Sequence, residues 1–399
     1  MKRDIPLHAV LSAYVEKGSV DNKALFEQLS LDLSMPAETL LKKAPVGRSG
    51  EKHNLFARSV RWHQQTLKRL GVIERMDRGV WRLTDKAKAE LTQQKPQTVM
   101  LAFSTELGCA LWGNAQDVFA NLQEEITLAF TSPPYPLAVE RQYGNVEQGK
   151  YVDWLVQMLE PIVKNLRAGG SLVLNLSNDI FVPGMPSRSL YLERVTLALH
   201  DRLGLHLMDR FVWHNPSKPP GPIQWASLRR MQLNVAYEPV LYFTNDPMKA
   251  LGDNRRCLIE HTDKQKKLIE QGGEQRNASN SGGAYVIKQG SYSNETRGAI
   301  ARNLQTIGHR DADQTPARKF CKEMGLPAHP APMPTKLAEF FVEFLSNKDD
   351  LVVDPFGGWA TTGKAAENKG RRWIVTERCK EYLLAASERF KKCEGFSYA

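Results

Sequence analysis

Apolar positions recur with a helical period in the first part of the chain. The spacing predicts helices over residues 5–11, 21–29 and 56–70. Two short alternating stretches, 72–75 and 79–84, flank a polar turn, which predicts a β-hairpin. Thr84 and the residue after it then cap a last helix. These elements predict a small domain of helices and a hairpin over residues 1–95.

The pattern changes after residues 96–104, a polar and proline-containing stretch that we interpret as a linker. Apolar runs predict strands at residues 126–130, 171–176, 211–213, 239–243, 351–353 and 372–376. Helical spacing predicts helices over residues 151–166, 190–203 and 336–345. This alternation predicts an α/β domain with a doubly wound, mostly parallel sheet over residues 105–399. Residues 246–325 interrupt it, because they are polar and lack a clear period.

Composition and charge narrow the class of protein. The 42% hydrophobic content of the 399 residues is ordinary for a chain that buries a core. The net charge of +10 favours a nucleic-acid partner, since Lys and Arg neutralise phosphates. No apolar run is long enough to span a membrane, and the first residues lack the apolar core of a signal peptide. We therefore expect a cytoplasmic protein.

The cysteines give little support to a metal or disulfide site. They stand far apart and form no CxxC pair: Cys109, Cys257, Cys321, Cys379 and Cys393. Such spacing disfavours both a disulfide framework and structural zinc, so we expect reduced thiols and no metal.

A glycine turn follows the predicted strand 351–353, and a helix begins near Thr361. Glycines let the backbone approach a ligand, and nucleotide-like ligands bind beyond the carboxyl ends of such strands. The next strand ends at Glu377, whose carboxylate can accept hydrogen bonds from two ribose hydroxyls. The residues predicted to bind a cofactor here are Asp354, Pro355, Phe356, Gly357, Gly358, Thr361, Thr362 and Glu377.

A second motif, Ser132-Pro133-Pro134-Tyr135, directly follows the apolar strand 126–130. The two prolines fix the backbone and remove two N–H donors. The Ser132 hydroxyl and the Pro133 carbonyl then remain as acceptors beside an aromatic ring. Acceptors of this kind can orient the hydrogens of a planar amine while Tyr135 stacks on its ring, so we predict that these four residues are catalytic.

Together the two motifs resemble the amino-methyltransferases of DNA. Their order, SPPY before DPFGG, resembles the circularly permuted β group, and the resemblance covers about residues 105–392. Residues 329–337 resemble the segment that feeds the helix over the methionine end of the cofactor, which implies that Thr335 and Lys336 bind it. Stretches at 143–145, 151–154 and 215–218 resemble PvuII-type N4-cytosine methyltransferases most.

This resemblance implies a Rossmann-like fold with a seven-stranded sheet in which one strand is reversed. It implies S-adenosylmethionine as the methyl donor, duplex DNA as the substrate and a DNA-reading role for residues 246–325. Lys218 is expected to contact DNA. The family's glycine motif often continues with Ser or Gly where this chain has Trp359, so the packing around the cofactor is expected to differ there.

The predicted helix 56–70 carries a cluster of cations: Arg58, Arg61, Lys68 and Arg69. Helices followed by a basic hairpin resemble a winged helix, and residues 58–84 resemble the N-terminal domain of Mrr-type restriction proteins. We interpret the four cations as DNA contacts. The alternative is a helical packing or dimerisation module.

The predicted reaction is methylation of cytosine N4 after the base flips out of the duplex. Ser at the first motif position favours cytosine, whereas Asp favours adenine in this family, so N6-adenine methylation is the main alternative. C5 methylation is disfavoured because no cysteine follows a proline. An RNA or small-molecule methyltransferase and a DNA-binding regulator with an inactive fold are further hypotheses. The expected setting is restriction-modification or epigenetic marking, with a cognate restriction endonuclease as a functional partner.

Overall fold

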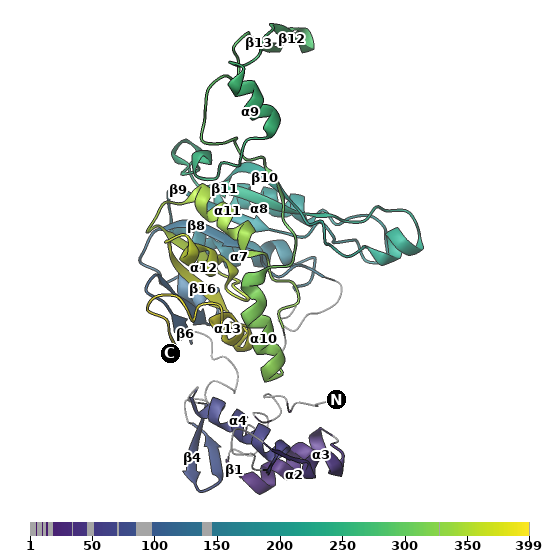
Figure 1. Cartoon of the computed structure of the whole chain (residues 1–399), viewed down its shortest axis with the longest axis vertical. Coiled ribbons are helices and arrows are strands. Elements are labelled where there is room, and N and C mark those ends of the chain that lie inside the picture. Colours follow the sequence, from purple (N-terminus) through teal and green to yellow (C-terminus); the bar gives the residue numbers. More distant parts are fainter. Residues whose placement is uncertain are drawn as a thin grey trace.

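The computed structural model describes residues 98–137, 146–326 and 328–398 in the larger domain. Toward the N-terminus it describes residues 5, 10, 13–14, 19–33, 35–45, 52–69 and 72–84. A small N-terminal domain and a larger α/β domain are visible in Figure 1. Most of the helix predicted over residues 5–11, the helix predicted after Thr84 and the stretch 143–145 lie outside the described residues. No helix in the described part is long and apolar enough to cross a membrane.

A central sheet organises the larger domain. Its described strands are β6 (Met100–Ser104), β7 (Gly108–Trp112), β8 (Ile126–Thr131), β9 (Leu166–Asn175), β10 (His206–His214), β11 (Tyr237–Thr244), β14 (Leu304–Thr306), β15 (Leu351–Asp354), β16 (Arg372–Glu377) and β17 (Ser397–Tyr398). Their order across the sheet is β14-β10-β11-β9-β8-β15-β16-β7-β6-β17. From β10 to β7, only β11 runs against its neighbours. The predicted seven-stranded core with one reversed strand is therefore confirmed, and β14, β6 and β17 extend its edges.

The start of this domain differs from the prediction. Residues 100–104 were interpreted as part of the linker, but they form β6, which pairs antiparallel with β7. That part of the linker interpretation is wrong. Residues 100–104 are few and only partly buried, so their sequence pattern is too short to predict a strand. Pairing with β7 determines their structure.

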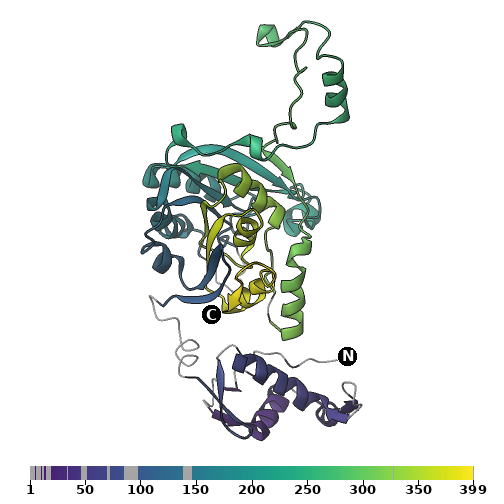
Figure 2. The same cartoon turned by 60° about the vertical axis from the view of Figure 1, so that its left-hand side comes forward.

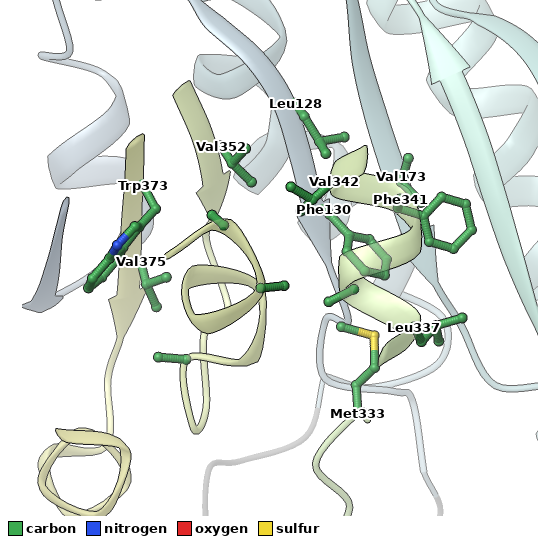
Figure 3. Packing of buried hydrophobic residues seen from close by; sticks show 14 of the residues in the cluster. Leu128, Phe130, Val173, Met333, Leu337, Phe341, Val342, Val352, Trp373 and Val375 are labelled. Atoms are coloured by element: carbon green, nitrogen blue, oxygen red, sulfur yellow. The ribbon is translucent and has the colours of Figure 1, made fainter. Parts of the chain in front are cut away.

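Helices cover both faces of the sheet. On one face lie α11 (Thr335–Leu345), α12 (Thr361–Asn368) and α13 (Lys380–Ser387). The other face is covered by α6 (Ala115–Phe119), α7 (Tyr151–Lys164) and α8 (Tyr191–Leu203). Every residue of β8 is buried because the strand has helices on both sides, which explains its unbroken apolar run. Figure 3 shows side chains of α11, including Leu337 and Phe341, packed against Phe130 of β8 and Val173 of β9.

Residues 245–334 form a long insertion between β11 and α11. Its elements are η2 (Pro247–Lys249), η3 (Asn254–Arg256), α9 (Asp263–Glu270), β12 (Ala278–Asn280), η4 (Ser281–Gly283), β13 (Tyr285–Ile287), β14, η5 (Ala312–Gln314) and α10 (Thr315–Met324). The sequence pattern did not predict α9 and α10. In Figures 1 and 2 the segment with α9, β12 and β13 stands out from the body as an arm.

The arm is attached at the amino-terminal edge of the parallel strands. The Asn245 amide donates to the carbonyls of Leu166 and Arg167 at the start of β9. Arg256 donates to the carbonyl of Ser346, which precedes β15. The chain returns to the carboxyl edge at β14, which pairs with the end of β10.

The described N-terminal elements fit the predicted winged helix. They are β1 (Ser19–Asp21), α2 (Asn22–Asp32), α3 (Ala37–Leu41), β2 (Lys43–Pro45), β3 (Lys52–Asn54), α4 (Leu55–Arg69), β4 (Ile73–Asp77) and β5 (Val80–Leu83). The predicted hairpin is present, because β4 and β5 pair antiparallel and β1 adds a third strand. The side chain of Asp21 caps α2 by accepting from the N–H groups of Lys23 and Ala24.

Candidate active site

The two predicted motifs meet at one edge of the sheet. The strands β8, β15 and β16 are neighbours, and they end at Thr131, Asp354 and Glu377. Because parallel strands end at the same edge, the segments that follow them converge. A pocket of about 290 Å³ lies there. Of the predicted residues it is lined by Ser132, Pro133, Pro134, Tyr135, Pro355, Phe356 and Glu377.

Glu377 presents a fixed carboxylate to this pocket. One oxygen accepts from the N–H of Gly358 at 2.8 Å, and the other accepts from the N–H of Cys379 at 2.7 Å. Burial raises the pKa of Glu377, while these N–H donors favour its ionised form. A carboxylate held in this way is suited to accept hydrogen bonds from ligand hydroxyls without reorganising.

The glycines of the turn are required by packing as well as by ligand approach. A Cβ on Gly357 would lie 2.0 Å from the Cγ1 of Val375 on β16, so any side chain would force the turn away from the sheet. Gly358 has a φ of +52°, which a residue with a side chain rarely adopts. The turn therefore packs tightly on β16 and keeps the N–H of Gly358 directed at Glu377.

Asp354 joins the two motifs and does not line the pocket. Its Oδ1 accepts from the Thr131 hydroxyl at 2.6 Å and from the N–H of Phe356 at 3.0 Å. Burial raises the pKa of Asp354 to about 6. Because Thr131 immediately precedes Ser132, this bond fixes the Ser132–Tyr135 motif relative to the glycine turn. The structure thus gives Asp354 a supporting position, where the sequence predicted a cofactor contact.

The other predicted cofactor residues surround the turn without lining the pocket. Thr362 donates to the carbonyl of Phe130 at 3.0 Å. Thr361 and Thr335 both accept from the buried guanidinium of Arg389, which is ion-paired with Asp313. These contacts hold α11 and α12 at the carboxyl edge. Lys336 is exposed on the first turn of α11.

Trp359 does not line the pocket, although its ring centroid lies 6.1 Å from that of His329, which does. Its ring is buried, and the guanidinium of Arg318 on α10 lies 5.5 Å from the ring centroid. The predicted difference from the family pattern therefore occurs beneath α10. Because Trp359 is not among the residues that line the pocket, it does not itself form part of the pocket wall.

In the motif predicted to be catalytic, the hydroxyls of Ser132 and Tyr135 are 2.9 Å apart. The side-chain amide of Asn175, at the end of β9, donates to the Tyr135 hydroxyl at 3.2 Å. Burial, and next the Glu238 carboxylate, raise the pKa of Tyr135 well above its usual range, so the phenol stays protonated. No described residue donates to the carbonyl of Pro133, which leaves that acceptor available to a ligand.

Glu238 completes this network, and the sequence analysis missed it. Its Oε2 accepts from the Tyr135 hydroxyl at 3.3 Å and from Asn175 at 3.1 Å. Its Oε1 accepts from the ammonium of Lys218 at 3.2 Å, with both side chains 18% exposed. Lys218, predicted to contact DNA, is thus paired with a carboxylate that contacts the catalytic motif. A polar residue at the start of β11, beside the end of β9, was the signal available in the sequence.

Other pocket residues were also missed. Asn114 and Gln116 follow β7, Trp154 and Met158 belong to α7, and Tyr382 belongs to α13. The ring of Trp154 lies 5.5 Å from that of Phe356, so the two form one apolar wall. Asn114 had a sequence signal, because it stands directly after a strand that neighbours β16. Among the described residues, no group of three or more His, Cys, Asp or Glu side chains could hold a metal ion.

The four predicted DNA-contacting cations of α4 are all exposed, on the side opposite its buried residues Phe56, Val60 and Leu67. The two ends of the helix differ in surroundings. Arg69, with Trp62, lines a second pocket of about 420 Å³ together with residues of α10 and α13. Arg58 and Arg61 are not part of that pocket.

Comparison with known proteins places this geometry in a family. A family model described as DNA methylase (N6_N4_Mtase) matches residues 126–388, which is two thirds of the chain. The chain belongs to the DNA methylase family. A second model, the Mrr N-terminal domain, matches residues 7–93 of this methylase. Both predicted resemblances are thereby confirmed.

Individual relatives agree with this assignment. The methylase is 36% identical to the type II methyltransferase M.PvuII of Proteus hauseri over 290 residues, which cover 72% of this chain and 85% of the relative. The solved structure of PvuII DNA methyltransferase (cytosine-N4-specific) matches with a TM-score of 0.57 and 32% identity, covering 72% of this chain and 87% of that one. The DNA adenine methyltransferase YhdJ of Escherichia coli (strain K12) is 23% identical over 69% of the chain and 79% of its own length.

Proposed function

We propose that this methylase transfers a methyl group from S-adenosylmethionine to the exocyclic N4 of cytosine in duplex DNA. The observation that carries the proposal is the pocket at the carboxyl edge, where Ser132-Pro133-Pro134-Tyr135 and Glu377 line one cavity. The similarity to the cytosine-N4-specific PvuII enzyme supports cytosine over adenine.

The pocket residues fit S-adenosylmethionine. Glu377 would accept hydrogen bonds from the ribose hydroxyls, and the wall of Phe356, Trp154 and Met158 would cover the apolar parts of the molecule. The Glu377 carboxylate also favours a cationic ligand. When bound, S-adenosylmethionine supplies an electrophilic methyl group on a positively charged sulfur.

The catalytic motif orients the target amine. The lone pair of an exocyclic amine is delocalised into the base, so the site must turn it toward the methyl group. The Pro133 carbonyl, which no described residue uses, and the Ser132 hydroxyl accept the two amine hydrogens. Tyr135 supports the flipped base beside them.

The polar network behind the motif accepts the proton that the methylated nitrogen releases. The nitrogen gives a proton to the Ser132 oxygen, which passes its own proton to Tyr135, and Tyr135 passes its proton to Glu238. Glu238 then returns the proton to solvent through its partly exposed carboxylate. No covalent bond between enzyme and base is required.

Sequencing of genomic DNA from cells that express the chain tests this function. We expect N4-methylcytosine at one short sequence, and none in cells that express the Ser132→Ala variant. N6-methyladenine at a defined sequence would show that the target base is adenine and not cytosine, in agreement with the similarity to YhdJ. Absence of both methylated bases would contradict the proposal.

The N-terminal domain adds DNA affinity through α4. Arg58 and Arg61 are exposed on its cationic face, outside the pocket that includes Arg69. Each cation removed from a phosphate should reduce the slope of log affinity against log salt by about 1, for all DNA sequences alike.

We therefore expect the Arg58→Gln/Arg61→Gln double variant to bind DNA more weakly and with a flatter salt dependence. Binding titrations at several salt concentrations measure both quantities. Lys23→Gln, which removes an exposed cation of α2 in the same domain, is the matched control and should change neither. An unchanged salt slope in the double variant would favour the alternative of a packing or dimerisation module.

A further inference from the structure

Apart from Lys218, the connection between β10 and β11, residues 215–236, has no role in the function derived so far. We refer to it as the β10–β11 loop. It begins at the carboxyl end of β10 and ends at the start of β11, so it leaves the sheet at the edge that holds the pocket. Lys218 near its start pairs with Glu238 just after its end, and Glu238 contacts Tyr135. The loop is therefore anchored to the catalytic network.

The loop has a defined fold of its own. It contains the helical turn η1 (Ile223–Leu228), and the N–H of Val235 donates to the carbonyl of Gly221 at 2.8 Å. Ala226 and Val235 are buried inside it. The amide of Gln232 donates to the carbonyl of Pro186 at 3.0 Å, which ties the loop to the segment before α8. In Figure 1 the loop, coloured teal, extends away from the sheet.

Large apolar side chains are exposed on this loop. Leu233 is 87% exposed, and Ile223, Leu228 and Met231 are each more than 60% exposed. We refer to these four residues as the apolar tip. Several exposed apolar side chains on one rigid element are unfavourable in water, and such groups mark a surface that a partner covers.

The surroundings identify the partner as duplex DNA. Arg229 and Arg230 lie between Leu228 and Met231, are both exposed and form no ion pair with a described residue. Cations around an apolar tip suit a partner with phosphates on its outside and stacked bases inside. The same loop is anchored to the site that takes the target base, so a duplex at the pocket must pass beside it.

We propose that the apolar tip enters the duplex beside the target base and occupies the space that the flipped base leaves, while Arg229 and Arg230 contact the flanking phosphates. This inference rests on the proposed function. Leu, Ile and Met are residues that DNA-bending proteins insert between base steps. Flipping costs a few kcal/mol because stacking and pairing are lost. Apolar contacts from the tip offset that loss and slow the return of the base.

The test compares two duplexes that carry the methylated sequence found by genomic sequencing. In one the target base is normally paired, and in the other it faces an abasic site. Leu228→Ala/Leu233→Ala should lower the methylation rate of the paired duplex at least about tenfold and leave the rate on the abasic duplex within about twofold, because an unpaired base is cheaper to flip. Met248→Ala is the matched control, since Met248 is 92% exposed in η2 at the opposite edge of the sheet, and it should match the parent on both duplexes.

A parent-like rate of the double variant on the paired duplex would overturn the inference, and so would an equal loss on both duplexes. Base flipping is also measured without methyl transfer, from the fluorescence of 2-aminopurine placed at the target position. The parent protein should raise that fluorescence, and the double variant should raise it less. If the parent transfers no methyl group to either duplex, the proposed function fails, and the fluorescence still decides the role of the tip.

Discussion

A Tyr135→Ala variant should bind S-adenosylmethionine like the parent protein and methylate DNA at least about a hundredfold more slowly, because misplacement by about 1 Å at a reacting centre costs that much. In the proposed function the ring supports the flipped base, and stacking on an aromatic side chain contributes about 1–3 kcal/mol per base. The hydroxyl also links Ser132 to Glu238. The measurements are calorimetry for the cofactor and single-turnover methylation for the rate.

Two companion variants separate the ring from the hydroxyl. Tyr135→Phe keeps the ring and removes the proton path, so it should retain DNA affinity and lose turnover. Ser132→Ala should behave in the same way, because its hydrogen bond acts when the amine is aligned and deprotonated. Full activity in Ser132→Ala and Tyr135→Ala would show that the motif has been misassigned. A covalent adduct with 5-fluorocytosine in the substrate would contradict the direct transfer.

Local patterns were sufficient to predict the parts of the fold that are buried from both sides. All six residues of β8 and all four of β15 are buried, so their apolar runs are continuous and easily recognised. The strands β6 and β7, near one edge of the sheet, are only partly buried. Their mixed apolar and polar composition gave no clear strand pattern. The amphipathic helix α10 was missed because it stands in a polar insertion without neighbouring strands to give it context.

The site shows the same division between local and long-range information. Pro133, Phe356 and Glu377 belong to motifs that are contiguous in sequence, so they could be named without the fold. Asn175 is a single polar residue at the end of β9 and Glu238 one at the start of β11, and only the strand order brings them to Tyr135. Asp354 was correctly placed in the motif, but its bond to Thr131 depends on the adjacency of β8 and β15.

Glu377→Ala should weaken binding of S-adenosylmethionine by about 1.5–3 kcal/mol, the range for hydrogen bonds to a charged group. The carboxylate is half-buried in the pocket wall and held by the N–H groups of Gly358 and Cys379, so little reorganisation would oppose hydrogen bonds to the ribose. DNA affinity without cofactor should remain near that of the parent, because the catalytic motif and the N-terminal domain are unchanged.

The same variant leaves two backbone N–H groups without their acceptor, so a change in fold stability must be separated from a change in binding. Thermal unfolding without ligand measures the first, and calorimetric titration with S-adenosylmethionine at a temperature where the variant is folded measures the second. Glu381→Ala removes an exposed carboxylate from the start of α13, four residues away, and should bind like the parent. A folded Glu377→Ala protein with parent-like affinity would place the ribose elsewhere and remove Glu377 from the cofactor site. A loss of affinity for S-adenosylmethionine in Glu377→Ala but not in Glu381→Ala would instead assign the carboxyl end of β16 to the ribose. Because β15 is the neighbour of β16, the glycine turn after β15 would then be assigned to the rest of the cofactor.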